Sequence, residues 1–215
     1  MNTIRMVNRI EALDNKRCKI YTEQSEVFVL YKGEISQYKI QEQKAIPESV
    51  YQMIQTDILP KRAKKRCLNL LKVRPYTEYK LREKLKEGYY SSNIIDEAIE
   101  YVKSFHYIDD YDLACQYIFY HKERESRKKI EEKLLQKGIS KDILEQAFRD
   151  SYQSEEECLE MEYTQAYKLL EKKHYDAGRM DWKENQKIYA FLMRKGIRTA
   201  VIRKVMALKE EEEVI

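Results

Sequence analysis

The sequence predicts a mainly α-helical protein: a tandem array of three three-helix repeats, preceded by a small β-containing N-terminal segment. From Ala63 onward, apolar residues recur at helical spacing almost throughout. The 215 residues include only 5 Gly and 3 Pro, too few for a fold that needs many tight turns. The strongest indication is an internal repeat, which is the sequence signature of a repeat architecture.

The N-terminal segment, residues 1–60, combines short β-like runs with one helix. The candidate strands are Thr3–Val7, Lys19–Tyr21 and Glu26–Tyr31, and the candidate turns are Asp14-Asn15 and Lys32-Gly33. A small antiparallel sheet or meander fits this pattern. A helix is expected to follow from Ser49 to about Leu59, and Pro60 is expected to break it.

The repeat relates equivalent positions by fixed offsets. An offset of 49 residues places Glu83-Lys84-Leu85 on Glu132-Lys133-Leu134, and a further offset of 58 residues places Gly138 on Gly196. The repeats are expected at residues 61–106, 107–152 and 153–215, the last with an acidic tail at 210–213. The expected helices are 63–73, 78–87 and 92–103, then 111–122, 127–137 and 141–150, then 156–172, 184–195 and 199–208.

Polar residues recur at the expected starts of these helices. Thr77 and Ser126 are equivalent and precede the second helix of their repeats, while Ser91 and Ser140 precede the third. Their side-chain oxygens are expected to accept hydrogen bonds from the free N–H groups of the first turn. Coincident caps, glycines and helix lengths indicate a true repeat and not a chance alignment of amphipathic helices.

The composition indicates a soluble, reduced, cytoplasmic chain. Its N-terminus has charges where a secretory signal needs an apolar stretch, and no run approaches the length of a membrane span. The four cysteines are widely spaced and contain no C-x-x-C. A net charge of +4 is mildly basic and is by itself weak support for a nucleic-acid partner.

No pattern in the sequence indicates catalysis. Gly-rich phosphate loops and the G-x-S-x-G motif are missing, and the histidines and cysteines do not have zinc-site spacing. Asp109-Asp110 directly precedes a helical run, so N-capping explains the pair better than acid–base chemistry. The sequence therefore predicts no catalytic residue, no metal ligand and no cofactor.

Basic residues are the candidate binding groups, because they recur in equivalent places on the second helix of each repeat. The candidates are Arg74, Lys80, Lys84, Lys128, Lys129, Lys133, Lys137, Lys187, Arg194, Lys195, Arg198 and Arg203. Aligned like charges cost free energy unless a partner neutralises them. The alternative is that these residues form an ordinary solvated helix face.

Four stretches in order resemble motifs of the RecX family of recombinase regulators. They are Arg74–Leu85, Tyr107–Ala114, Lys129–Ile139 and Phe191–Ile197. The sequence departs from the family pattern at His106, where the family has Gly, and at Ile197, where it has Phe. The resemblance covers about residues 63 to 208, and the N-terminal segment is compatible with longer members of the family.

The resemblance implies a non-enzymatic modulator of RecA, usually an inhibitor. Such a protein docks on the recombinase filament on single-stranded DNA, lowers its ATPase and strand exchange, and so affects DNA repair and the SOS response. We expect a monomer that contacts DNA weakly or through the filament, with no membrane partner. The alternatives are a stand-alone helical DNA-binding protein and a helical scaffold that binds only protein.

Overall fold

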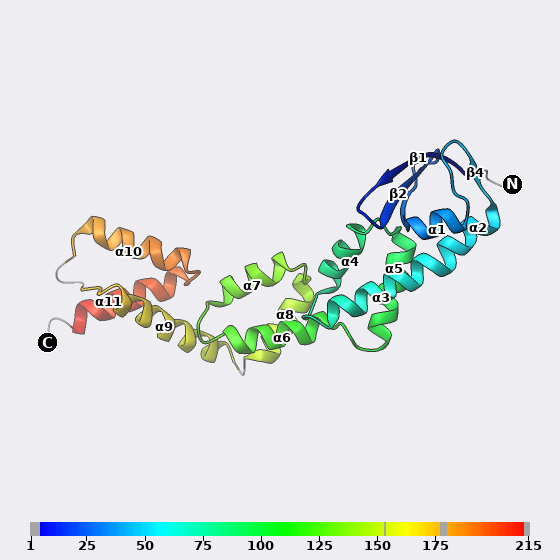
Figure 1. The fold of residues 1–215 in the computed structure, drawn as a ribbon. Helices are drawn as coiled ribbons and strands as arrows, with labels where there is room; N and C mark the ends of the chain where they lie inside the picture. Colours follow the sequence, from blue (N-terminus) through cyan, green and yellow to red (C-terminus); the bar gives the residue numbers. More distant parts are fainter. Residues whose placement is uncertain (1–4, 153, 177–179, 213–215) are drawn as a thin grey trace. The chain divides into compact units, whose positions relative to one another are not determined.

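The computed structural model describes residues 5–152, 154–176 and 180–212. The chain divides into two compact units, Met1–Asp109 and Asp110–Ile215, called unit 1 and unit 2 below. Unit 1 combines a small sheet with helices, and the described part of unit 2 is helical (Figure 1). The mainly α fold with a β-containing N-terminal segment is therefore confirmed.

The sheet of unit 1 has four antiparallel strands. They are β1 (Arg5–Ala12), β2 (Arg17–Thr22), β3 (Val27–Tyr31) and β4 (Ala45–Ile46), in the order β3-β2-β1-β4. The turn predicted at Asp14-Asn15 joins β1 to β2, with Ile10 opposite Ile20. β1 runs further than the predicted Thr3–Val7, whose first two residues lie outside the described part. The short strand β4 was not predicted, because two residues are too few for a period of two to be recognised.

The predicted turn at Lys32-Gly33 and the predicted helix end at Pro60 are both wrong. Lys32-Gly33 is not a turn but the start of α1 (Lys32–Gln37), in which Glu34 accepts a hydrogen bond from the backbone N–H of Tyr31 at 2.7 Å. Pro60 does not end the helical path either. α2 (Glu48–Met53) continues through a π-helical turn, η1 (Ile54–Ile58), into α3 (Leu59–Leu71). Pro60 lies in the first turn of α3, directly after this π-helical turn.

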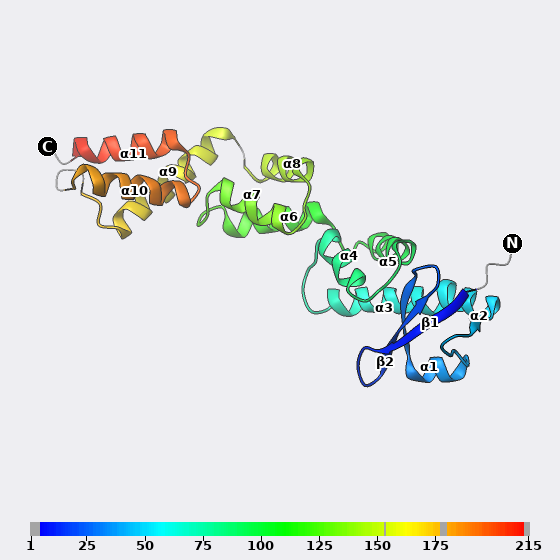
Figure 2. The same cartoon turned by 90° about the horizontal axis from the view of Figure 1, so that it is seen from above.

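The first repeat consists of α3, α4 (Glu78–Lys86) and α5 (Ser92–Ser104). One apolar core joins it to the sheet, since Ile20 and Leu30 of the strands belong to the same buried cluster as Leu81 and Ile99 of the helices. The division of the chain into four domains stays a prediction, but unit 1 buries its strands and its first repeat together. Figure 2 shows α3 passing beside both the strands and α5.

Unit 2 contains two three-helix groups, each with its own apolar cluster. The first consists of α6 (Asp110–His121), α7 (Arg127–Gln136) and α8 (Lys141–Ser151), and the second of α9 (Glu155–Lys172), α10 (Trp182–Arg194) and α11 (Thr199–Glu212). Figure 2 shows α9, α10 and α11 gathered in one group. Leu134 and Leu192, equivalent in the repeat, are each fully buried in their cluster. Helical structure continues into the acidic tail as far as Glu212, and Glu213 lies outside the described residues.

The turns between second and third helices show why the repeat includes glycine. Gly138 and Gly196 have φ of 85° and 84°, in the left-handed region that favours glycine. Tyr89 occupies the equivalent place in the first repeat with φ of 61°. His106 also has a positive φ, 53°, which explains the Gly that the resembled family has there. Its side chain strains one residue of backbone and leaves the helices in place.

Three of the four predicted caps are present. Thr77, Ser126 and Ser140 accept hydrogen bonds from the backbone N–H three residues later, at 3.2, 3.4 and 3.4 Å. Ser91 has the extended backbone of an N-cap residue, but its side chain makes no capping hydrogen bond. The prediction for Ser91 is therefore wrong. The position of Ser91 in the sequence brings its hydroxyl to the start of the helix, but the side-chain rotamer determines whether the capping hydrogen bond forms.

Candidate partner-binding surface

The two helix groups of unit 2, α6–α8 and α9–α11, are joined by a contact between two helix ends. Ser126, the N-cap of α7, donates from its Oγ to the carbonyl oxygen of Lys195, the C-cap of α10, at 2.8 Å. The same Oγ accepts from the backbone N–H of Lys129. The positive end of one helix dipole thus meets the negative end of another, which is a favourable arrangement.

Glycine at position 196 allows this close approach. A Cβ at Gly196 would lie 2.4 Å from the Oγ of Ser126 and 3.5 Å from the Cβ of Lys128. Such a distance to Ser126 is far inside van der Waals contact. The missing side chain therefore serves two purposes, because it permits the left-handed turn and makes room for the start of α7.

Further contacts from α9 fix this region. The side-chain amide of Gln165 donates to the carbonyl oxygens of Lys122 and Glu125, at 2.7 and 3.2 Å. The ammonium of Lys122 lies 3.0 Å from the carbonyl oxygen of Ser151 and 3.4 Å from a carboxylate oxygen of Glu157. Gln165 is buried, so its hydrogen bonds hold the loop before α7 in one position.

The contact of the helix ends gathers four basic residues that sequence reasoning had placed on two separate helices. Lys128 and Lys129 lie in the first turn of α7, and Arg194 and Lys195 end α10. We call these four residues the basic joint. Lys128 and Arg194 are exposed, and no carboxylate among the described residues pairs with any of the four. Positive side chains at a helix N-terminus are unfavourable by themselves, so an anionic partner would stabilise them.

The rest of α7 and the start of α11 are less available. The ammonium of Lys133 contacts both carboxylate oxygens of Glu125 at 2.6 Å, and the ammonium of Lys137 lies 5.7 Å from the ring centroid of Tyr117. Burial opposes the ionisation of Glu125, but the hydrogen bond from Lys133 and the nearby positive charges together outweigh it and lower the pKa of that carboxyl. Arg198 binds buried Glu162 through both its guanidinium and its backbone N–H. Arg198 is thus held in an internal ion pair.

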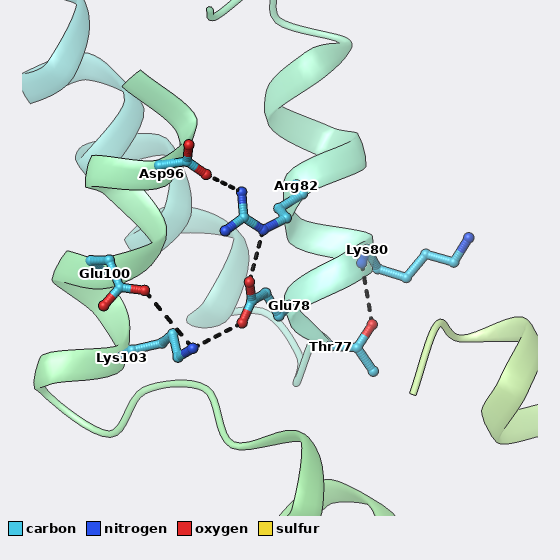
Figure 3. Close-up of polar contacts among 7 residues, drawn as sticks. All are labelled: Thr77, Glu78, Lys80, Arg82, Asp96, Glu100 and Lys103. Atoms are coloured by element: carbon cyan, nitrogen blue, oxygen red, sulfur yellow. Dashed lines mark hydrogen bonds and ion pairs between the residues drawn. The ribbon is translucent and has the colours of Figure 1, made fainter. Parts of the chain in front are cut away.

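In the first repeat, acids neutralise the basic residues of α4. The guanidinium of Arg82 lies 2.8 Å from Glu78 and 2.5 Å from Asp96, and Lys103 of α5 bridges Glu78 and Glu100 (Figure 3). Burial raises the pKa of Glu78, but the hydrogen bonds from Arg82 and Lys103 outweigh it and bring the pKa below its ordinary value.

The two predicted binding residues of α4 are paired in the same way. Lys80 lies 2.7 Å from Glu83, and Lys84 lies 2.7 Å from Glu87, each one helical turn away. Figure 3 also shows the cap at the start of the helix, where the backbone of Lys80 donates to Thr77. The 49-residue offset makes these lysines equivalent to Lys129 and Lys133 of α7, where Glu132 corresponds to Glu83 but Gln136 replaces Glu87.

The three remaining candidates lie apart from these contacts. Arg74 is exposed between α3 and α4, with its guanidinium 4.8 Å from the ring centroid of Tyr76. Lys187 of α10 and Arg203 of α11 are both exposed. Unit 2 therefore assembles four of the twelve candidates into one place, the basic joint, and holds Lys133 and Arg198 in internal ion pairs.

The described residues contain no cluster suited to metal binding. Within them, no three His, Cys, Asp or Glu side chains come together as a metal site. All four cysteines are free, and burial raises the pKa of Cys67 to about 11, so this thiol is not a nucleophile at neutral pH. None of the helices in this part of the chain has the length and apolar character needed to cross a membrane.

Tandem three-helix groups of this kind define a helical-repeat protein. Two segments match known domains: residues 63–101 match the first three-helix domain of RecX, and residues 160–206 match the third. The regulatory protein RecX of Clostridium perfringens is 30% identical over 184 residues, which cover 84% of each chain. That of Clostridium beijerinckii is 30% identical over 156 residues, which cover 70% of this chain and 71% of the relative.

These similarities show that the chain belongs to the RecX family of regulatory proteins. The relative from Finegoldia magna is 28% identical over 213 residues and is covered to 99% of its length. Two solved structures share the fold at 22% identity. The match to a crystal structure of regulatory protein RecX has a TM-score of 0.59 and covers 98% of that chain and 94% of this one. The match to the crystal structure of RecX from Lactobacillus salivarius has a TM-score of 0.57 and covers 97% of that chain and 71% of this one.

Proposed function

We propose that this protein regulates the RecA recombinase as a non-enzymatic inhibitor. It binds the RecA filament on single-stranded DNA and lowers the ATPase and strand exchange of that filament, and so acts in DNA repair, recombination and the SOS response. We further propose that it works as a cytoplasmic monomer. Membership of the RecX family supports the regulatory role, and the basic joint is the observation that supports a polyanionic partner.

The joint suits a filament because its charges come from two helix groups at once. Lys128 and Lys129 belong to one group, and Arg194 and Lys195 to the other. A partner that contacts all four also stabilises the packing of the helix ends held by Ser126. Acidic protein grooves and phosphate backbones both attract such a cluster, and with either partner binding weakens as salt concentration rises.

Co-sedimentation with RecA filaments on single-stranded DNA tests this proposal, with naked single-stranded DNA as control. We expect the protein to pellet with filaments more than with naked DNA, and ATP turnover to fall at near-stoichiometric amounts. Stronger binding to naked duplex DNA would favour a stand-alone DNA-binding protein. An unchanged ATPase rate with no co-sedimentation would favour a scaffold for other proteins.

A charge reversal of one residue from each helix tests the assigned surface. Lys128→Glu combined with Arg194→Glu should weaken filament binding by roughly tenfold or more, because both reversals replace attraction by repulsion at one place. Lys168→Glu combined with Lys172→Glu is the matched control, since both are exposed lysines of α9 outside the joint. Equal losses in the two variants would show that net charge decides binding and that the joint does not.

A further inference from the structure

Unit 1 contains a cationic hollow that the proposed function does not use. It has a volume of about 530 Å³ and lies between the strands β2 and β3, the helix α3 and the loop after α4. Its lining includes five cations and no carboxylate. The cations are Arg17 of the sheet and Lys61, Arg62, Lys65 and Arg66 of α3. Both the N-terminal sheet and the first repeat are therefore needed to form it.

The cations of the hollow differ in whether a carboxylate already pairs with them. Arg62 forms an ion pair with Glu34 and donates to the carbonyl oxygen of Val29 at 3.0 Å. Arg66 donates from Nε to the carbonyl oxygen of Lys84 at 3.3 Å, which leaves its positive charge without a carboxylate among the described residues. Lys65 is exposed, and no described carboxylate pairs with it.

The two other cations form ion pairs near the protein surface. Arg17 lies 2.7 Å from Asp14, and Lys61 lies 2.5 Å from Asp57. Neither acid lines the hollow. Exposed pairs of this kind are worth about 0–1 kcal/mol, so a stronger anion can compete for the cations.

Aromatic rings accompany the cations. Tyr31 and Tyr90 both line the hollow, and Tyr31 is 42% exposed beneath the guanidinium of Arg62, which lies 4.5 Å from its ring centroid. Burial raises the pKa of Tyr90, whereas the positive charges of Arg62 and Arg66 act in the opposite direction. The hydroxyl of Tyr90 is thus in reach of the field of these guanidinium groups and remains protonated as a hydrogen-bond donor.

Phosphate esters are the anions that this lining fits best. Guanidinium and ammonium groups bind phosphate oxygens, and a tyrosine ring provides a stacking face for a base. A single strand exposes both its phosphates and its bases, whereas a duplex keeps its bases stacked inside. A hollow of this size accommodates roughly one nucleotide and continues onto the exposed face of α3 that carries Lys61 and Lys65.

We infer that the hollow between the N-terminal sheet and the first repeat binds the backbone of single-stranded DNA, with Lys61, Lys65 and Arg66 on its phosphates and Tyr31 beside a base. The inference rests on the proposed function only in taking single-stranded DNA as a partner. It assigns a role to the N-terminal sheet as one wall of a binding site. It also gives a role to the dense basic run of residues 61–66, which lies outside the twelve candidates.

The test is direct binding of a fluorescein-labelled dT oligomer of about 12 nucleotides to the full chain, followed by anisotropy. The variant is Lys61→Glu combined with Lys65→Glu, two exposed residues of α3. We expect affinity to fall roughly tenfold, and the salt dependence to lose about 0.7 of slope for each phosphate contact removed. The control, Lys44→Glu with Lys72→Glu, changes the same charge at exposed lysines of unit 1 outside the hollow and should stay within about twofold.

Each other outcome overturns the assignment. Unchanged oligomer binding by the Lys61/Lys65 variant, or an equal loss in the control, would remove the hollow as the site. Loss of ATP binding by the variant with oligomer binding intact would assign the hollow to a free nucleotide. Tighter binding to a duplex of the same length would exclude a single strand as the preferred ligand. No recombinase is present, so failure here leaves the filament experiment unaffected.

Discussion

The helices α4 and α7 occupy equivalent places in the repeat but differ in how their basic residues are paired. α4 has Glu78 at its first position and Glu87 just past its end, and these acids hold Arg82, Lys103 and Lys84. α7 has Arg127 and Gln136 at the two equivalent positions. Lys133 pairs with Glu125 of the preceding loop, while Lys128 and Lys129 form no ion pair with a described carboxylate. Lysines at equivalent positions thus differ in their availability for binding, because the acids at the two ends of α4 have no counterpart in α7.

The two helices also pack against different parts of the protein. α4 belongs to a core that unit 1 shares with its sheet, while the first turn of α7 packs against the end of α10 in the next helix group. That packing brings Lys128 beside Gly196. We therefore propose that α4 mainly supports the N-terminal sheet and that the first turn of α7 contributes to the surface that binds the filament.

The largest expected effect concerns the joint itself. Gly196→Ala should lower the free energy of unfolding of unit 2 by about 2–3 kcal/mol, because a Cβ strains the left-handed turn and displaces the Ser126 hydroxyl from both of its hydrogen bonds. Gly138→Ala, with nearly the same φ, should cost only about 1 kcal/mol. Urea denaturation of both variants measures the difference. Equal losses would mean that backbone strain alone accounts for Gly196.

A smaller effect is expected from the acid that distinguishes α4 from α7. Glu78→Gln should destabilise unit 1 by about 1–2 kcal/mol at pH 7, since it weakens the hydrogen bonds with Arg82 and Lys103. The pKa of Glu78 is lowered in the folded state, so its contribution is complete above the ordinary value of 4.5 and is lost as the pH falls below that value. The difference between wild type and variant should therefore shrink in acid.

Glu132→Gln is the control for this pH dependence, because Glu132 is exposed on α7. Its effect on the unfolding free energy should be small at every pH. Thermal unfolding from pH 7 down to pH 3 would follow both variants. A loss for Glu78→Gln that stays constant across this range would contradict the role of its charge.

The smallest effect separates two serines that the sequence makes equivalent. Ser140→Ala should cost about 1 kcal/mol, because Ser140 caps α8 through the backbone N–H of Ile143. Ser91→Ala should cost about 0.3 kcal/mol or less, since the Ser91 side chain makes no capping bond. Denaturant midpoints of the two variants provide the comparison. A larger loss at Ser91 would show that its hydroxyl caps α5 in solution.

Most of the fold was predictable because each helix has local signals. Caps such as Thr77 and Ser126 mark starts, Gly138 and Gly196 mark ends, and the starts and ends of the nine repeat helices were mostly within two residues of the structure. The helix at Lys32-Gly33 was missed because glycine is typical of turns, and the capping by Glu34 acts over only three residues. The prediction for Pro60 was wrong because the sequence alone does not distinguish a proline that lies in the first turn of a helix from one that ends a helix.

The candidate surface was less predictable than the fold. Periodicity places lysines on a face but does not show which of them an acid will hold, as Lys133 and Arg198 illustrate through Glu125 and Glu162. Glu162 lies 36 residues before Arg198, a separation at which no local pattern applies. The joint at Ser126 is likewise a contact between distant residues. A serine that caps its own helix has no sequence feature that reveals a second bond to another repeat.

The most direct test of the central claim compares two charge-matched variants in filament binding. Lys128→Gln with Lys129→Gln removes two positive charges from the basic joint, and Lys80→Gln with Lys84→Gln removes two from the acid-paired face of α4. Affinity for RecA filaments on single-stranded DNA would be measured over a range of salt concentrations. We predict a loss of roughly tenfold and a shallower salt dependence for the α7 variant, and a loss below about threefold for the α4 variant. Equal losses, or a larger loss for the α4 variant, would contradict the assignment of the binding surface to the joint.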